Sequence, residues 1–551
     1  MNNFSTTLIA CSLTLFLGAC SATAPASLDA SPQGQLANQW FADGEASIAL
    51  GTQKTINNKK GAAKNVILFV GDGMGISTIT AARILAGQQQ GQTGEEYQLS
   101  FEQLPFSGLV KTYNTNQQTP DSAGTMTAMM SGVKTKAGFI GVSQASRRAD
   151  CQDYLNNGEA LFSALELAEL AGKSTGIVST ARLTHATPAA TYAKSVERDW
   201  ESDGDLKNGE AQLGCKDIAS QLIDFKPNLE QRINDGNPLP IVSGIDVAFG
   251  GGRRAFFGDD PASIAGFSEK AGEGRRKDGR NLIEEWQQQG GQYVMDQAGF
   301  DALSINNDAP VLGLFNASHM RYSANRLEDK SGEPTLTEMT DTAIDLLQRN
   351  NEGFFLMVEA GRIDHGHHAG NAYNALTDAV ELSSAVQKAL EKTNPEETLI
   401  IVTADHSHVF TMAGYPTRGN PILGKVVGND DHGEPKSEPT KADDGMPYTT
   451  LGYATGRGHA SLENNTNADV RYGKPIDAGR HDISDIDTTH SGYHQEALVP
   501  LGSETHGGED VAVYASGPGS HLVSGTIEQN VIFHVMNHAA DLTGKASKNI
   551  Q

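Results

Sequence analysis

The sequence predicts an α/β fold with a doubly wound, mostly parallel central sheet, helices on both of its faces and an inserted cap subdomain. From Lys64 onward, short apolar runs of strand length alternate with longer segments of helical periodicity, which is typical of a parallel sheet. Between residues 413 and 498 this alternation gives way to Gly, Asp, His, Pro and Thr, which indicates an insertion.

The apolar runs are the expected strands, and most of the chemically active side chains stand at their ends. Four of the runs are residues 65–70, 353–358, 398–403 and 511–514. Acidic and histidine residues follow the first three and precede the fourth. Since ligands of open α/β sheets bind beyond the carboxyl ends of the strands, we expect Asp72, Glu359 and Asp405 to meet at one edge.

Helical periodicity marks the segments between the strands. A helix after Ser122 is expected because the Ala- and Met-rich stretch 125–131 follows a serine that suits a helix N-terminus. The insertion is interpreted as a folded cap, since its tyrosines supply apolar surface; a disordered insertion is the alternative. The other expected helices are 39–50, 159–170, 335–347 and 372–390.

Composition indicates a soluble globular protein that does not bind nucleic acid. The chain has 551 residues, of which 38% are hydrophobic and 20% charged, and its formal net charge is -25. No basic cluster is apparent that would release counterions from a nucleic acid. Any site for an anionic substrate must therefore be made locally positive by arginine or by metal ions.

The N-terminus predicts export. Residues 1–19 contain an apolar stretch too short to span a bilayer, and Leu17-Gly18-Ala19-Cys20 resembles the lipobox of a lipoprotein signal peptide. Cys20 would then carry a lipid, residues 20–38 would form a flexible tether, and the protein would be periplasmic or anchored to the outer membrane. An ordinary cleaved signal peptide is the alternative.

Two cysteines remain once Cys11 is removed and Cys20 is modified. Cys151 and Cys215 are an even pair in an oxidising compartment, so we expect a disulfide between them. Neither has a second soft ligand beside it, which argues against a metal site.

The segment from Glu359 to His368 predicts a metal centre. If a helix starts just after the strand, Asp364 and His368 stand at i and i+4 and project from one face. A carboxylate and an imidazole suit Zn²⁺. A solvated helix start is the alternative, but the clusters around Asp72, Asp405 and His506 repeat the pattern and favour a metal site.

Ser122 is the candidate nucleophile. The helix dipole and the free N–H groups of a helix N-terminus favour an anion beside it, although serines there are more often plain caps. The sequence has no discernible Ser-His-Asp order, so a metal ion would have to lower the pKa of the hydroxyl. Residues 71–75 do not form a P-loop because no Lys-Ser/Thr pair follows them.

These residues resemble the alkaline phosphatase family, especially its vertebrate-type and related bacterial members. The resemblance runs from about Gln39 to Leu542 and is most specific in the segments 354–368, 402–408 and 504–513. It implies a catalytic domain made of residues 39–412 and 499–545, with 413–498 as a crown-like inserted subdomain. It also implies a homodimer.

The resemblance assigns two zinc ions and one magnesium ion. The first zinc falls to Asp364, His368 and His506. The second falls to Asp72, Asp405 and His406, with Ser122 joining it. Asp72 also bridges to magnesium, which Thr187 and Glu359 hold, and His185 lies near this third site without ligating it. For the calcium site of vertebrate-type members, Glu333 matches a ligand but Asn316 replaces a glutamate, so calcium is left open.

The resemblance further implies hydrolysis of small phosphate monoesters through a phosphoserine. Arg198 matches the arginine that clasps two phosphate oxygens, and Ser122 would attack in line. Phosphodiester or sulfate ester hydrolysis on the same fold is one alternative, against which Glu359 and Thr187 speak. A lipid-anchored protein that only binds metal or phosphate is another, and it would need neither Ser122 nor Arg198.

Overall fold

The computed structural model describes residues 59–234, 236–239, 241–259, 274–329, 332–460, 466–475 and 479–550. The predicted signal peptide 1–19, the lipidation site Cys20, the tether 20–38 and the helix expected at 39–50 lie outside the described residues. None of the described helices is long and apolar enough to span a membrane.

A large mixed sheet forms the centre of the described structure, as predicted. Within the described residues its strands run in the order β15-β2-β14-β8-β1-β7-β3-β4-β6-β5. From β8 to β5 each strand is parallel to the next one in this order, whereas β14 is antiparallel to both β8 and β2. The strands are β1 (Asn65–Gly71), β2 (Phe106–Lys111), β3 (Ser174–Arg182), β4 (Val247–Gly251), β5 (Gln292–Val294), β6 (Val311–Leu314), β7 (Phe354–Ala360), β8 (Thr398–Ala404), β14 (Val511–Ser516) and β15 (Gly525–Glu528).

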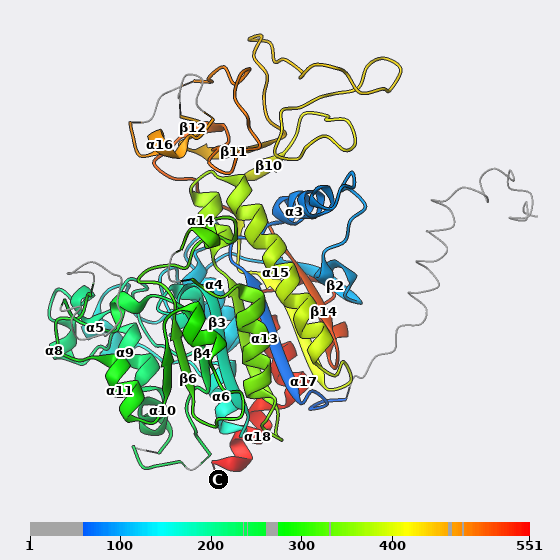
Figure 1. Ribbon diagram of the computed structural model, residues 1–551. Coiled ribbons are helices and arrows are strands. Elements are labelled where there is room, and N and C mark those ends of the chain that lie inside the picture. The colour runs from blue at the N-terminus through cyan, green and yellow to red at the C-terminus, as the bar shows by residue number, and fades with distance from the viewer. Residues whose placement is uncertain are drawn as a thin grey trace, which may run out of the picture. The chain divides into compact units, whose positions relative to one another are not determined.

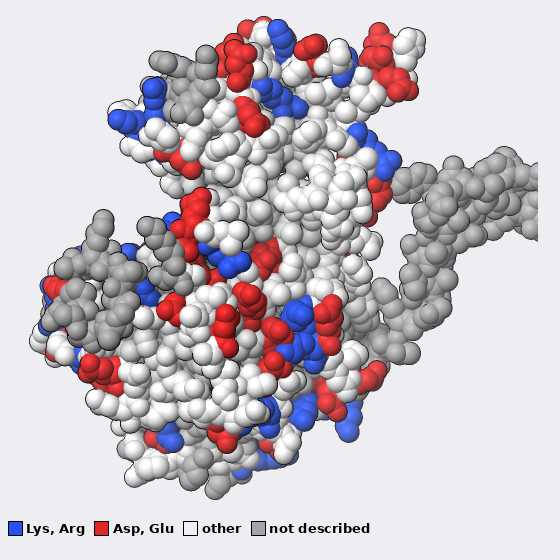
Figure 2. Space-filling view, in the orientation of Figure 1, with Lys and Arg blue, Asp and Glu red and all other residues white. Residues whose placement is uncertain are grey.

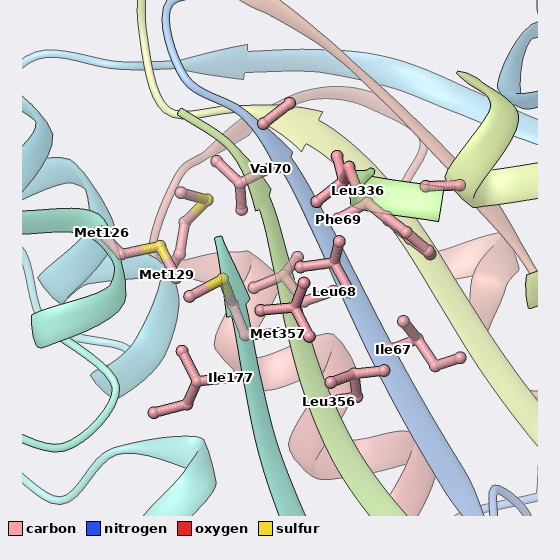
Figure 3. Packing of buried hydrophobic residues seen from close by; sticks show 14 of the residues in the cluster. Ile67, Leu68, Phe69, Val70, Met126, Met129, Ile177, Leu336, Leu356 and Met357 are labelled. Atoms are coloured by element: carbon pink, nitrogen blue, oxygen red, sulfur yellow. The ribbon is translucent and has the colours of Figure 1, made fainter. Parts of the chain in front are cut away.

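Strand β1 lies in the middle of this sheet and is buried almost throughout. Its side chains alternate between the two faces and meet apolar side chains of β7, including Leu356 and Met357 (Figure 3). A parallel strand covered on both faces reads as a continuous apolar run, which is why Ile67 to Val70 carry no polar side chain.

Helices cover both faces of the sheet. Figure 1 shows α13 (Leu336–Leu347) and α15 (Ala372–Lys392) in front of the strands and α17 (Val531–Ala540) behind them. On α13, Leu336, Met339, Ala343, Ile344 and Leu347 are buried at helical spacing, which is the apolar stripe expected of a helix packed on a sheet. The doubly wound architecture predicted from the sequence is therefore confirmed.

Side-chain caps decide where two of the predicted helices begin. Helix α6 spans Ala164–Leu170 and not 159–170, because the Ser163 side chain accepts from the Glu166 N–H and Glu166 reaches back to the Ser163 N–H. Thr335 caps α13 in the same way. The predicted start of α6 at residue 159 was wrong because it followed apolar periodicity and overlooked the reciprocal Ser163–Glu166 capping box.

A second, small sheet is formed by residues within and beside the segment 413–498, which is the predicted insertion. Among its described residues and those flanking it, β10 (Phe410–Met412), β11 (Leu451–Gly456) and β12 (Ala497–Pro500) pair in that order. The Tyr453 hydroxyl lies 2.9 Å from Nδ1 of His367, and Gln495 Oε1 accepts from the Ala372 N–H at 2.7 Å. These contacts tie the described part of the insertion to the helices that follow β7.

Acidic and basic side chains are interspersed on the face shown in Figure 2, where the described lysines and arginines form no large patch.

Cys151 and Cys215 form a disulfide with a Cα–Cα distance of 6.1 Å. Both pack into a small apolar cluster with Phe139, Val196 and Trp200. Because the bond closes a loop of sequence separation 64, replacing both cysteines by serine is expected to lower the free energy of unfolding by about 4 kcal/mol.

Denaturant unfolding of the double variant beside the oxidised wild type measures this loss. The reduced wild type is the control, since it lacks the bond but keeps both sulfurs in the apolar cluster. An unfolding free energy equal to that of the oxidised protein in both samples would contradict the prediction.

Candidate metal centre and nucleophile

The site begins where three parallel strands end in register. Gly71 at the end of β1 pairs with Ala360 of β7 and with Ala404 of β8. The residues next in sequence, among them Asp72 and Asp405, therefore leave the sheet at the same edge, as predicted. A tight turn follows in which Gly73 adopts φ +69° and donates its N–H to Asp405 Oδ1 at 3.0 Å.

Gly73 allows close packing at this turn. A Cβ at this position would lie 2.3 Å from Nε2 of His408, so a larger residue would push into the site. Its positive φ also disfavours any residue with a Cβ. Gly73 therefore allows the backbone to turn tightly around Asp72.

The first cluster joins two segments that are far apart in the sequence. Asp364 and His368 both lie on α14 (Arg362–His368), so the predicted i, i+4 pair is present. His506 comes from β13 (His506–Gly507), with its Nε2 3.5 Å from Asp364 Oδ1. The ligand atoms of these three residues and of His408 all lie within 4.8 Å of one another.

The histidines of this cluster fit a cation. His368 Nδ1 lies 2.8 Å from the Glu504 carbonyl oxygen and His506 Nδ1 lies 2.8 Å from the Pro120 carbonyl oxygen, so both Nδ1 atoms donate. The two Nε2 atoms then carry lone pairs, yet they face each other at 3.1 Å. A metal ion between them and Asp364 resolves this repulsion.

The second cluster lies beside the candidate nucleophile. Asp72, Asp405 and His406 are fully buried and offer ligand atoms within 4.8 Å of one another. His406 Nε2 is 3.3 Å from Asp72 Oδ1 and 3.1 Å from Ser122 Oγ. Asp72 Oδ2 and Asp405 Oδ2 are buried and have no hydrogen-bond partner among the described residues, which fits a bound cation.

The third cluster shares Asp72 with the second. Within the part of the chain that the structure describes, three buried atoms have no hydrogen-bond partner: Glu359 Oε1, Thr187 Oγ1 and His185 Nδ1. The Ser179 hydroxyl donates to Glu359 Oε2. Burial raises the pKa of Glu359 to about 8, and the nearby Asp405 carboxylate adds to the shift. His185 offers a ligand atom within 4.8 Å of Asp72 and Glu359, so it lies in this cluster. The Thr187 side chain lies beside Glu359.

Ser122 is the first residue of α4 (Ser122–Ser131) and is not its cap. The Asp121 side chain caps the helix by accepting from the Gly124 N–H at 3.1 Å. This leaves the Ser122 hydroxyl free to face the second cluster, 3.4 Å from Asp72 Oδ1. The positive end of the helix dipole therefore points to the place where an alkoxide or a phosphate would sit.

Arg198 is held next to the nucleophile. Its Nη1 donates to Asp121 Oδ2 at 3.1 Å, and its Nη2 lies 3.2 Å from His185 Nε2. The guanidinium thus provides a fixed cation in a site otherwise rich in carboxylates. Its remaining N–H groups are available to an anionic oxygen atom.

Two residues of the site, His408 and Glu504, have no assigned role in the sequence analysis. His408 is buried and bridges Glu504 Oε2 at 2.6 Å and Asp364 Oδ1 at 2.8 Å. Burial lowers the pKa of His408, but the Glu504 and Asp364 carboxylates outweigh it and raise that pKa to about 10. With both nitrogens donating, His408 orients Asp364; its position in residues 402–408 was the available signal.

Asn316 and Glu333, which were compared with a calcium site, lie together. The Asn316 side-chain amide donates to Glu333 Oε1 at 2.6 Å, and the Arg321 N–H donates to Glu333 Oε2 at 2.7 Å. Both oxygens of this buried carboxylate therefore have protein donors.

A buried serine at a helix N-terminus, clustered carboxylates and imidazoles that fit metal ions, and an anchored guanidinium together define a metal-dependent hydrolase of the α/β class. The family model for alkaline phosphatase matches residues 63–542. The chain therefore belongs to the alkaline phosphatase family, whose members hydrolyse phosphate monoesters.

Curated relatives agree with this assignment, and solved structures share the fold. The chain is 44% identical to the tissue-nonspecific alkaline phosphatase of Gallus gallus over 87% of this chain and 84% of that protein. It is 42% identical to the alkaline phosphatase of Gadus morhua over 92% and 97%. The alkaline phosphatase structures from Thermus thermophilus and from the Antarctic bacterium TAB5 share the fold, with TM-scores of 0.57 and 0.54 at 23% identity. They cover 90% and 88% of this chain, and 98% and 99% of their own chains are matched.

Proposed function

We propose that this phosphatase hydrolyses a broad range of small phosphate monoesters through a phosphoserine on Ser122. The observation that carries the proposal is the Ser122 hydroxyl at the start of α4, 3.1 Å from His406 Nε2 and 3.4 Å from Asp72 Oδ1. A hydroxyl that only capped the helix would bond to its backbone N–H groups instead.

The three clusters would hold two zinc ions and one magnesium ion. The first zinc falls to Asp364, His368 and His506, and the second to Asp72, Asp405 and His406. The mixed carboxylate and imidazole donors suit zinc. The third site, with Asp72, Glu359 and Thr187, is rich in oxygen donors and suits magnesium, although His185 beside it softens that preference. When bound, these cations lower the pKa of hydroxyl groups and neutralise charge on the attacking and leaving oxygens.

The residues of the chain then act in two displacements. Ser122 Oγ attacks phosphorus while the ester oxygen leaves, so that one P–O bond forms as another breaks. Arg198 binds two of the non-bridging oxygens and offsets their charge, and the α4 N-terminus favours the anion. Water then attacks the phosphoserine, inorganic phosphate leaves, and Ser122 regains its proton.

Arg198 is expected to contribute mainly to phosphate binding. Replacing it by lysine keeps the charge but removes the planar guanidinium, so kcat/KM should fall about 10-fold, mostly through a higher KM. Replacing it by alanine also removes the charge, and kcat/KM should then fall about 100-fold. Steady-state kinetics and inhibition by inorganic phosphate check this result. Arg147→Lys on the surface is the matched control, and an unchanged inhibition constant in Arg198→Ala would contradict the assignment.

The function itself is tested by comparing a chromogenic phosphate monoester with the matching diester and sulfate. Protein stripped of metal and then reloaded with Zn²⁺ and Mg²⁺ is expected to recover monoester turnover and to prefer it strongly. A diester or sulfate preference would move the chemistry to the first alternative. Absence of turnover in the reloaded protein would favour the binding-protein alternative.

Further parts of the proposal concern the protein outside the active site. We propose that Cys20 is lipidated, that the protein is exported to the periplasm or the outer membrane, that it is a homodimer, and that residues 413–498 form its cap. The lipobox-like segment 17–20 supports the first two. Fatty-acid labelling of wild type and Cys20→Ser, and light scattering of the purified protein, test these points.

A further inference from the structure

A cavity of about 390 Å³ lies between α5 (Cys151–Asn157), the segment 192–200 and α10 (Phe225–Asn234). None of its lining residues belongs to the three metal clusters. Its volume falls in the range of small-molecule sites, roughly 300–1,000 Å³. The apolar part of its wall comes from Tyr154, Leu155, Tyr192, Val196, Trp200 and Phe225.

Two cations in this wall share one carboxylate. Lys194 Nζ lies 3.1 Å from Glu166 Oε2, and Arg232 Nη2 donates to Glu166 Oε1 at 2.9 Å. Glu166 Oε2 also accepts from the Ser163 N–H at 2.8 Å, so this carboxylate is already well satisfied. The guanidinium of Arg232 packs over the Phe162 ring at 4.6 Å.

Lys194 has donors to spare. Only 9% of its side chain is exposed, and beyond the ion pair with Glu166 its ammonium makes no hydrogen bond among the described residues. Arg232 Nε is also buried, and no described residue accepts a hydrogen bond from it. Burial lowers the pKa of Lys194 to about 8 against the opposing effect of Glu166, as expected for a charge that is incompletely compensated.

The wall as a whole is positive in an acidic protein. Its charged residues are Lys194, Lys216, Arg232 and Glu166, so three positive charges less one negative leave a surplus of two. The whole chain has a net charge of -25. A cavity with this local surplus, bounded on its other sides by aromatic and aliphatic groups, complements an anion that carries an apolar body.

We propose that this cavity is a second ligand site of the protein, specific for a small amphipathic anion: one carboxylate or sulfonate head that meets Lys194 and Arg232, joined to an aromatic or aliphatic body that fills the space beside Trp200 and Phe225. A neutral apolar molecule would leave the buried ammonium unsatisfied. An inorganic anion would leave the apolar wall uncovered. Neither loss applies to the amphipathic anion.

The test uses 8-anilinonaphthalene-1-sulfonate as a fluorescent probe of this chemistry. It is titrated against the full-length, metal-loaded enzyme in the presence of saturating inorganic phosphate, which occupies the positively charged active site. We expect one saturable site per chain. N-phenyl-1-naphthylamine, which has the same rings without the sulfonate, is expected to bind about 10-fold more weakly or worse.

Three variants locate the binding. Lys194→Gln should weaken sulfonate binding about 10-fold, since it removes the charge that meets the head group. Leu155→Trp, at a half-exposed position of the lining, should abolish binding by filling the space and alters no charge. Lys226→Gln, an exposed position of α10 outside the lining, is the matched control and should bind as the wild type does.

Each outcome decides the proposal. The proposal is supported if Leu155→Trp loses probe binding and Lys194→Gln binds the probe more weakly. In that case phosphatase activity and probe binding by Lys226→Gln should both be unchanged. Absence of saturable probe binding in the presence of phosphate, equal affinity for the neutral analogue, or unchanged binding in Leu155→Trp overturns it. Because Leu155→Trp leaves the buried ion pairs intact, the test holds even if Lys194→Gln fails to fold.

Discussion

Ser122→Ala is expected to reduce phosphomonoester turnover at least about a thousandfold, because it removes the atom that forms the covalent intermediate. The hydroxyl lies between the start of α4 and the second cluster. Steady-state kinetics with a chromogenic monoester measure the loss.

The controls for this variant separate chemistry from metal binding. Asp72, Asp405 and His406 remain, so the variant should retain its metal content by elemental analysis. Ser131→Ala, at the far end of the same helix, removes a hydroxyl that donates to the Thr127 carbonyl and should leave turnover nearly unchanged. Acid quenching with labelled substrate should trap phosphate on the wild type alone; a labelled Ser122→Ala protein would contradict the assignment.

Removal of the metal ions is expected to abolish turnover and to lower the melting temperature by at least about 10 °C, since each occupied site stabilises the fold by mass action. Asp72, Glu359 and Asp405 are fully buried, and Arg198 is the cation anchored beside them. Without metal ions these carboxylates repel one another in a medium that solvates them poorly.

The decrease in melting temperature on metal removal should be larger at higher pH. In the metal-free protein the pKa of Glu359 is raised from 4.5 to about 8 by burial. Its contribution to stability is then fully present below pH 4.5 and is lost as the pH rises through about 8. Calorimetry of chelated and reloaded protein at pH 6 and pH 9 checks this, with separate reloading of Zn²⁺ and Mg²⁺ as the control. A chelated protein that melts at the holoenzyme temperature at both values would contradict it.

Much of the fold followed from periodicity. The apolar runs that form β1, β7 and β8 were recognisable because strands buried on both faces have nearly continuous apolar sequences. Helix starts were less predictable. For α6 the apolar pattern suggested residue 159, whereas the helix begins at Ala164 because Ser163 and Glu166 satisfy its first N–H groups.

Some residues of the candidate site could be predicted from the sequence, but the full set could not. Asp364 and His368 lie on one short helix, so their i, i+4 spacing predicted that they share a face. His408 and Glu504 lie in different segments, and the imidazole holds the Asp364 carboxylate only once these segments meet. The cavity beside Lys194 was likewise not foreseen, since its wall joins α5, the segment 192–200 and α10.

The sequence by itself determined the elements that depend on neighbouring residues: the buried strands, the helix that carries Asp364 and His368, and the serine at the start of α4. Only the tertiary structure decided which side chains share a site. Register between β1, β7 and β8 brings Asp72, Glu359 and Asp405 to one edge, and the fold then carries Arg198 and His506 to them. The physical reason is that burial and electrostatic compensation depend on distances between segments remote in the chain, which local spacing does not encode.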